Sequence, residues 1–169
     1  MSQNQSDISV RMVTSEEDIS KVEELATEIW TEHYTPIIGI EQVEYMLGNF
    51  QSFDAIEKQI SEGMSYFLLN YKGEPSGYLA CKSEGEDLFL SKIYVLFELR
   101  GKGMGSYAME FLSSLAREKG SLRLSLTVNK NNTNSIRAYE KLGFVNLGPL
   151  ETDIGGGFVM DDYVMKKTL

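Results

Sequence analysis

A glycine-rich segment, Arg100-Gly101-Lys102-Gly103-Met104-Gly105, has the residue types that point most directly to ligand chemistry. It follows an apolar run, Leu88 to Leu96, and precedes apolar side chains at helical spacing, so it joins a predicted strand to a predicted helix. Glycines let a ligand approach the backbone closely, and the N-terminus of a helix favours an anion. Arg100 and Lys102 add positive charge. We therefore predict a phosphate-binding loop, the alternative being a glycine-rich turn that only begins a helix.

Two familiar phosphate-binding motifs do not fit this loop. A dinucleotide-binding G-x-G-x-x-G would need glycine at position 106, where the chain has Ser106. The nucleoside-triphosphate motif G-x-x-x-x-G-K-[ST] occurs nowhere in the chain. The loop therefore predicts a phosphate-containing ligand of another kind.

A second motif follows the next predicted strand and reads Asn132-x-x-Ser135-x-x-x-Tyr139-x-x-x-Gly143-Phe144. Together with the R-x-x-G-x-G pattern of the glycine loop, it resembles the GNAT superfamily of acyl-CoA-dependent N-acyltransferases. The resemblance extends over Ile8 to Lys167, and it depends on the two motifs occurring together at this separation. It implies acetyl-CoA as cosubstrate and no metal.

The resemblance also implies roles for individual residues. The backbone of Ile93 to Val95 would pair with the pantetheine amides, the N–H groups of Gly101 to Ser106 would bind the pyrophosphate, and Asn132 and Ser135 would bond the arm further along. Tyr139 would be the general acid beside the departing sulfur, the alternative being a buried aromatic side chain whose hydroxyl is satisfied elsewhere. The implied cofactor contacts are Ile93, Tyr94, Val95, Arg100, Gly101, Lys102, Gly103, Met104, Gly105, Ser106, Asn132 and Ser135.

The general base is not identified, because no carboxylate lies on the strand Leu88 to Val95, where several members of the superfamily carry one. His33 has a side chain suited to proton abstraction, but a lone histidine beside aromatic residues is often structural. A water chain to Glu32 or Glu28 is a further alternative. The resemblance places the segment around His33 as a loop over the acceptor side, and its predicted substrate contacts are Trp30, Glu32, His33 and Tyr34. The pair Asp161-Asp162 could also bind a cation, or be simply solvated.

Charge is unevenly distributed along this chain of net charge −9. Residues 1–99 hold 6 Lys/Arg and 18 Asp/Glu, whereas residues 100–145, which include the glycine loop, hold 8 and 3. The basic segment suits an anionic cofactor, and the acidic segment would attract a cation, although it could also serve only solubility. The acidic total argues against a nucleic-acid partner.

Composition indicates one domain in 169 residues. With Cys81 and His33 as the sole cysteine and histidine, the chain cannot build an internal disulfide or a Cys/His metal site. No signal-peptide pattern and no run of about 18 apolar residues is present, so we expect a soluble cytoplasmic protein without a membrane partner. We expect residues 1–7 to be disordered, and a homodimer is an open alternative.

The remaining sequence predicts the elements that position these residues. A strand at 8–13 precedes a capping box at Thr14 or Ser15, which begins a helix that runs to Trp30. Two short amphipathic helices follow, and then strands connected by hairpins. These elements and those after the glycine loop are helices at 40–48 and 53–62, strands at 65–71, 77–82 and 88–96, a helix ended by Gly120, a strand at 122–128, a helix at 133–142, and strands at 144–150 and 158–166.

This order predicts a mixed α+β fold with a parallel strand–helix–strand crossover at its centre. The resemblance implies the same architecture, a mixed and mostly antiparallel sheet flanked by helices, with two central parallel strands that splay apart. The leading functional hypothesis is acetyl transfer from acetyl-CoA to a primary amine, such as a small polyamine-like cation. The alternatives are a protein or peptide amine acetyltransferase and a non-catalytic acyl-CoA-binding sensor.

Overall fold

A computed structural model describes residues 7–169. The disorder expected for residues 1–7 concerns mainly residues 1–6, which lie outside the described residues, whereas the carbonyl of Asp7 accepts a hydrogen bond from the Lys72 N–H at 2.6 Å. The strands are β1 (Ile8–Met12), β2 (Ser65–Tyr71), β3 (Glu74–Glu84), β4 (Asp87–Val95), β5 (Arg123–Asn129), β6 (Val145–Gly155) and β7 (Phe158–Thr168). The helices are α2 (Glu16–His33), α3 (Thr35–Ile38), α4 (Ile40–Phe50), α5 (Phe53–Ser61), α6 (Met104–Glu118) and α7 (Thr133–Lys141), with a 3-10 turn η1 (Phe97–Leu99).

The strands form one seven-stranded sheet in the order β1-β2-β3-β4-β5-β7-β6. Strands β4 and β5 are parallel, whereas β1 with β2, β2 with β3, β5 with β7 and β6 with β7 are antiparallel. The mixed, mostly antiparallel sheet with helices confirms the predicted fold class. Contacts divide the chain into two units, unit 1 (residues 1–82 and 92–111) and unit 2 (residues 83–91 and 112–169). The expectation of a single domain stays a prediction.

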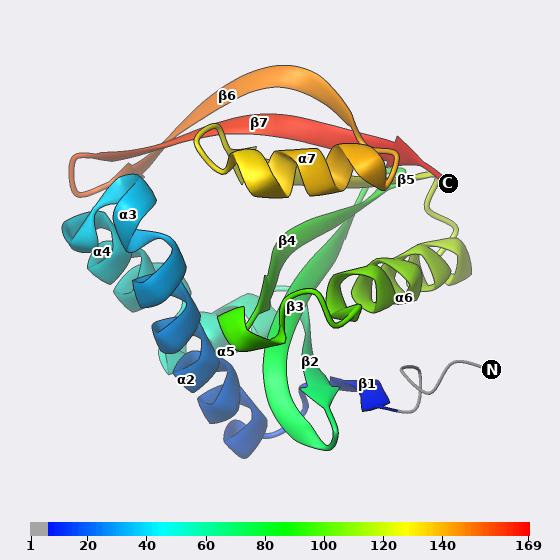
Figure 1. The fold of residues 1–169 in the computed structure, drawn as a ribbon, viewed down its shortest axis with the longest axis horizontal. Helices are drawn as coiled ribbons and strands as arrows, with labels where there is room; N and C mark the ends of the chain where they lie inside the picture. The colour runs from blue at the N-terminus through cyan, green and yellow to red at the C-terminus, as the bar shows by residue number, and fades with distance from the viewer. Residues whose placement is uncertain (1–6) are drawn as a thin grey trace. The chain divides into compact units, whose positions relative to one another are not determined.

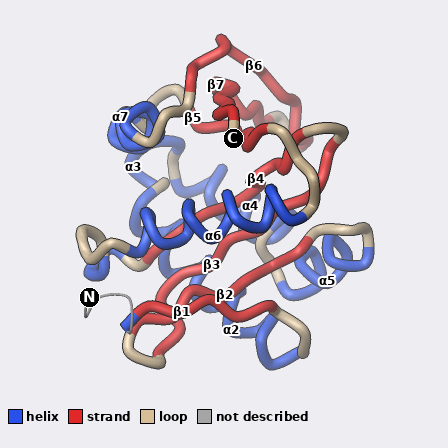
Figure 2. The backbone as a smooth tube through the Cα atoms, turned by 90° about the vertical axis from the view of Figure 1, so that its right-hand side faces the viewer, coloured by secondary structure: helices blue, strands red, loops and turns tan. Residues whose placement is uncertain are grey.

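Unit 1 is built in three layers. Strands β1, β2 and β3 lie side by side in antiparallel pairs (Figure 2). Helices α2 to α5 contact one another and gather on one side of these strands (Figure 1). The face that they cover carries Tyr66 and Tyr78, while Phe67 on the opposite face packs edge-on against Phe111 of α6 at 4.9 Å between ring centroids.

The predicted capping box begins α2. The Ser15 side chain accepts a hydrogen bond from the Asp18 N–H at 3.1 Å, as an N-cap residue should. The buried Asp18 carboxylate in turn accepts from the Thr14 N–H and pairs with Arg11 at 2.8 Å. Burial opposes ionisation, but the hydrogen bonds from Thr14 and Arg11 outweigh it and lower the pKa of Asp18.

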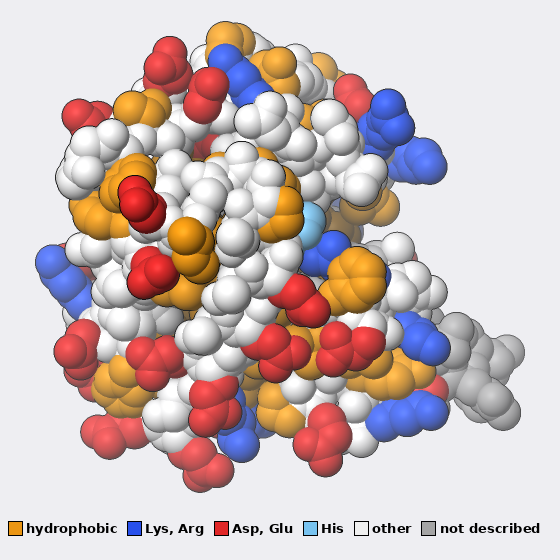
Figure 3. All heavy atoms as spheres, turned by 60° about the vertical axis from the view of Figure 1, so that its left-hand side comes forward, with side chains coloured by type: hydrophobic (Ala, Val, Ile, Leu, Met, Phe, Trp, Pro, Cys, Tyr) orange, Lys and Arg blue, Asp and Glu red, His pale blue; other side chains and the backbone are white. Residues whose placement is uncertain are grey.

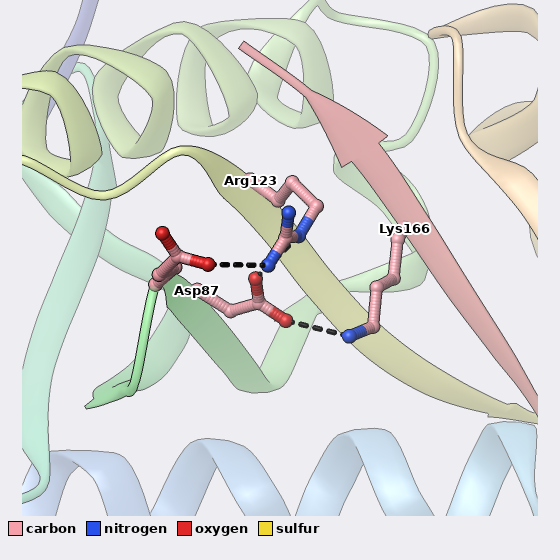
Figure 4. Close-up of polar contacts among 4 residues, drawn as sticks. Asp87, Arg123 and Lys166 are labelled. Carbon is pink, nitrogen blue, oxygen red and sulfur yellow. Dashed lines mark hydrogen bonds and ion pairs between the residues drawn. The ribbon is translucent and has the colours of Figure 1, made fainter.

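Unit 2 contains the start of β4, the end of α6, α7 and the strands β5, β6 and β7. The carboxylate of Asp87, at the first position of β4, accepts hydrogen bonds from Arg123 on β5 and Lys166 on β7, each at 2.7 Å (Figure 4). These contacts tie three strands together, and the bond from Lys166, followed by that from Arg123, lowers the pKa of Asp87. The paired carboxylate thus fixes the beginning of the parallel strand pair.

The elements that differ from the sequence prediction include the end of α2 and strand β6. The segment around His33 is not a loop: α2 continues to His33, and Tyr34 donates its N–H to the Trp30 carbonyl as the C-cap. The helix persists because the first glycine or proline after Trp30 is Pro36, and Pro36 itself lies in the first turn of α3, where its missing N–H costs nothing. Strand β6 is also longer than predicted, because it pairs with β7 as far as Gly155.

Candidate functional site

The glycine loop of unit 1 has the geometry of an open cradle. Gly101 and Gly103 adopt φ values of +79° and +86°, which L side chains rarely adopt, and a Cβ added at either position would meet nothing within 4 Å. The loop is exposed, and α6 begins immediately after it at Met104. Because the first N–H groups of a helix have no intrahelical acceptor, those of Met104, Gly105 and Ser106 are available to an anion. Arg100 and Lys102 flank them with positive charge.

The end of β4 is held by an unusually close backbone contact. A Cβ at Gly77 on β3 would lie 2.4 Å from the carbonyl oxygen of Tyr94, so only glycine fits there. The Leu96 N–H donates to the Ser76 carbonyl at 2.9 Å just beyond. The predicted pantetheine strand, Ile93 to Val95, is therefore positioned by β3.

Several predicted substrate residues meet around Tyr94. Trp30 stacks on Tyr34 at 4.4 Å between ring centroids, and Tyr94 packs edge-on against Trp30 at 5.5 Å and against Tyr34 at 6.0 Å. Tyr78 closes the cluster against Tyr94 at 5.4 Å. The cluster thus joins the last turn of α2 to the end of β4. Glu32, by contrast, is exposed.

His33 lies beside the glycine loop. Its Nδ1 is 3.5 Å from Nη1 of Arg100, a long contact in which the guanidinium can only donate. A neutral His33 that accepts at Nδ1 carries its proton on Nε2. The role of His33 as a base stays a prediction.

Lys92 is a residue of the site region that the sequence analysis missed. Its side chain is buried on β4, one position before Ile93, and its ammonium donates to the Gln59 side-chain oxygen at 2.6 Å, to the Phe50 carbonyl at 3.0 Å and to the Tyr66 hydroxyl. Burial lowers its pKa to about 7. A lone lysine inside the apolar run Leu88 to Leu96 was the available signal.

In unit 2, the second motif forms the start and one face of α7. Asn132 is buried and caps the helix, its side-chain oxygen accepting from the Ser135 N–H at 3.4 Å. Tyr139 lies one turn further along the same face and packs edge-on against Phe144 at 5.6 Å. The motif therefore brings Asn132 and Ser135 together and gives Tyr139 a defined place, while their contacts with a cofactor stay predictions.

The two adjacent acids on β7 differ sharply. Asp161 is half-exposed and pairs with Lys130 at 2.8 Å. Asp162 is buried, and its Oδ1 has no hydrogen-bond partner among residues 7–169. Burial, with the charge of Asp161, raises the pKa of Asp162 to about 6. Asp161 is therefore a solvated surface residue, whereas Asp162 is not.

The described residues contain neither a cluster suited to a metal ion nor a helix suited to spanning a membrane. Within residues 7–169, no three His, Cys, Asp or Glu side chains come together as a metal site would require. No helix in that part of the chain has the length and apolar character needed to cross a bilayer.

Known proteins resemble this chain in sequence and fold. The family model described as acetyltransferase (GNAT) family matches residues 22–144. An uncharacterised N-acetyltransferase of Mycobacterium tuberculosis is 32% identical over 100 residues, 59% of this chain and 64% of that protein. Thialysine N-epsilon-acetyltransferase of Bos taurus is 31% identical over 94 residues, 50% of this chain and 55% of that protein. The match therefore spans less than two thirds of either curated relative.

A solved structure extends the likeness to nearly the whole fold. PaiA N-acetyltransferase from Thermoplasma acidophilum, crystallised with coenzyme A, superposes with a TM-score of 0.80 over 96% of this chain and 99% of that one, at 22% identity. The family model covers well over half of the chain, and the fold agrees with it. The chain therefore belongs to the acetyltransferase (GNAT) family.

Proposed function

We propose that this protein transfers the acetyl group of acetyl-CoA to a primary amine. The observation that carries the proposal is the cradle at the start of α6, where two glycines with left-handed backbone and open space around them precede a helix N-terminus. Such a site suits a pyrophosphate, since it offers N–H donors, the positive end of a helix dipole and the side chains of Arg100 and Lys102.

The residues present suit thioester chemistry. The backbone of Ile93 to Val95 would hold the pantetheine arm, and an N–H donor aimed at the thioester carbonyl can stabilise the transition state by roughly 3 kcal/mol. Tyr139 would protonate the departing sulfur, because a phenol of pKa near 10 can share a proton with a thiolate as charge develops on it.

We propose a small cationic amine as acceptor. Residues 1–99 carry an excess of acidic side chains, and acidic side chains predominate over basic ones on the face that carries the helices of unit 1 (Figure 3). This potential would concentrate ammonium substrates. The bovine relative is named for acetylating the Nε of thialysine, a primary amine, which supports a small-molecule acceptor of this type.

The cofactor assignment is tested by a matched pair of glycine variants. Gly103→Val places a branched side chain in the proposed cradle, whereas Gly73→Val, at φ +81° in the β2–β3 turn, has nearly the same backbone strain and equally open surroundings. We expect coenzyme A to raise the melting temperature of the wild type and of Gly73→Val but not that of Gly103→Val. Normal binding by Gly103→Val would refute the cradle.

Activity is tested by thiol release from acetyl-CoA with a panel of polyamines, amino sugars, amino acids and N-terminal peptides. Turnover with small cationic amines, weakened by salt in kcat/KM, is the expected result. Preference for peptides would indicate a protein acetyltransferase. Coenzyme A binding without turnover of any amine would indicate a sensor.

A further inference from the structure

The buried carboxylate of Asp162 lies where the parallel strands of unit 2 stop pairing. The β4–β5 ladder begins at Asp87 and Arg123 and ends with Leu90 opposite Leu126. Strand β5 continues to Asn129, and across its other edge Asn129 lies opposite Asp162 of β7. Asp162 therefore lies beside the part of β5 that extends beyond its ladder with β4.

Asp162 also lies on the face of the sheet opposite to α7. Side chains alternate along a strand, so Asp162 shares a face with Val164 and Lys166, while Tyr163, Met165 and Lys167 share the other. A Cβ at Gly143, just after α7, would lie 3.5 Å from the Lys167 side chain, which places the end of α7 on that second face. Asp162 thus faces the side of this sheet that lies opposite to α7 and its Tyr139.

The hydrogen bonding of Asp162 distinguishes it from the structural acids. Asp18 and Asp87 are buried to a similar degree, and each carboxylate is held by a cation and further donors. Asp162 is 6% exposed, yet its Oδ1 has no hydrogen-bond partner among the described residues. A buried oxygen without a donor destabilises the folded protein, so its retention calls for an explanation such as a bound ligand group.

We propose that Asp162 is the general base that accepts the proton of the attacking amine. This inference rests on the proposed acetyl transfer. The nitrogen lone pair forms the N–C bond to the thioester carbonyl, whose π electrons move to oxygen. The N–H proton passes to the Asp162 carboxylate, an electron pair of the oxyanion re-forms the carbonyl as the C–S bond breaks with its own pair on sulfur, and sulfur takes the Tyr139 proton. Solvent then removes the proton from Asp162 and restores that of Tyr139, leaving amide and free coenzyme A.

The electrostatic surroundings suit this role. Among its neighbours on β5, β6 and β7, Asn129 and Leu150 are uncharged, and the charged side chains nearest in sequence, Asp161 with its partner Lys130, belong to the other face. With a pKa raised to about 6 by burial and by Asp161, the carboxylate is ionised at neutral pH and is a stronger base than an ordinary aspartate.

The test compares two neighbouring aspartates in the 169-residue chain. Asp162→Asn removes the base at nearly constant volume, and Asp161→Asn removes the same charge from the next residue on the other face. With acetyl-CoA and the best amine of the panel, we expect kcat of Asp162→Asn to fall about 100-fold or more, with unchanged affinity for coenzyme A by calorimetry. Asp161→Asn should stay within a few-fold of wild type.

Two further readouts separate a base from a structural residue. The wild-type kcat/KM should rise with pH through about 6, and this limb should be missing in Asp162→Asn. Weakly basic amines, which arrive unprotonated, should lose less activity in Asp162→Asn than strongly basic ones. Asp162→Glu keeps a carboxylate and should recover part of the activity, which provides a readout even if the asparagine variant folds poorly.

The outcomes distinguish this inference from the proposed function. Wild-type turnover in Asp162→Asn, an equal loss in Asp161→Asn, or a pH limb that survives the substitution would overturn the role of Asp162 and leave acetyl transfer intact. A wild type that binds coenzyme A but acetylates no amine would overturn both.

Discussion

Replacing Lys92 by methionine should make the protein more stable at pH 6 and remove a rise in stability above pH 7. Lys92 is 8% exposed and its pKa falls from the ordinary value of 10.5 to about 7, because burial penalises the ammonium. At about 1.4 kcal/mol per pH unit, this difference corresponds to roughly 5 kcal/mol against the charged form. Methionine is nearly as long as the lysine stem and carries no charge.

The hydrogen-bond network should survive the substitution. The Phe50 carbonyl still accepts from the Gln59 Nε2 at 3.0 Å, and the Gln59 side-chain oxygen still accepts from the Tyr66 hydroxyl at 2.6 Å. The Tyr66 hydroxyl loses Lys92 as a donor but still donates to Gln59, so each of the three groups keeps a hydrogen bond and the usual cost of breaking a buried polar contact is small. We therefore expect Lys92→Met to exceed wild type by about 1–4 kcal/mol at pH 6, as in other replacements of buried charge by apolar groups.

The sign of the pH dependence follows from proton binding. Between pH 7 and 10.5 the unfolded lysine keeps a proton that the folded one has released, so stability must rise with pH. Urea denaturation from pH 6 to 9.5 should show wild type gaining about 3 kcal/mol relative to Lys92→Met. A constant difference between the two proteins would mean that Lys92 stays charged, and a methionine variant less stable at pH 6 would refute the reasoning.

Two further variants test the cofactor strand and the acid. Gly77→Ala puts a Cβ 2.4 Å from the Tyr94 carbonyl oxygen, so it should lower the free energy of unfolding by about 1–3 kcal/mol. It should also weaken coenzyme A binding, because the end of β4 is displaced. Unchanged binding by calorimetry would show that Gly77 does not influence the cofactor site. Tyr139→Phe should lower kcat about 100-fold with coenzyme A affinity and melting temperature unchanged, and full turnover in this variant would exclude the acid role.

Local signals in the sequence predicted most of the fold. The capping box at Ser15, the glycine before α6 and the alternation in β2 and β5 depend on neighbouring residues, and the structure has these elements close to the predicted positions. The α2 C-terminus was placed too early because the apolar periodicity ends at Trp30, whereas no glycine or proline interrupts the helix before Pro36. The spacing of the glycines also predicted the position of the loop before α6, because the conformation of this loop depends on residues within one short segment.

The polar groups of the site could not be assigned in this way. The partners of Lys92 lie 26 to 42 residues away in sequence, on α4, α5 and β2, so no local pattern signals them. The sequence contains nothing that distinguishes Asp161 from the adjacent Asp162. Only the register of β7 against β5 and β6 separates a half-exposed partner of Lys130 from a buried carboxylate.

The three buried charged residues Asp87, Lys92 and Asp162 differ in their hydrogen-bond and ion-pair partners. Asp87 pairs with Lys166 and Arg123, which lower its pKa, so its role is to stabilise the fold. Among the described residues, Lys92 has no carboxylate partner, and three oxygens accept its hydrogen bonds. In the same part of the chain, Asp162 has no cation partner and no donor to Oδ1, and it lies beside the part of β5 that extends beyond its ladder with β4. Of the three, only Asp162 is left with an unmet hydrogen-bonding capacity that an ammonium or amine substrate would meet.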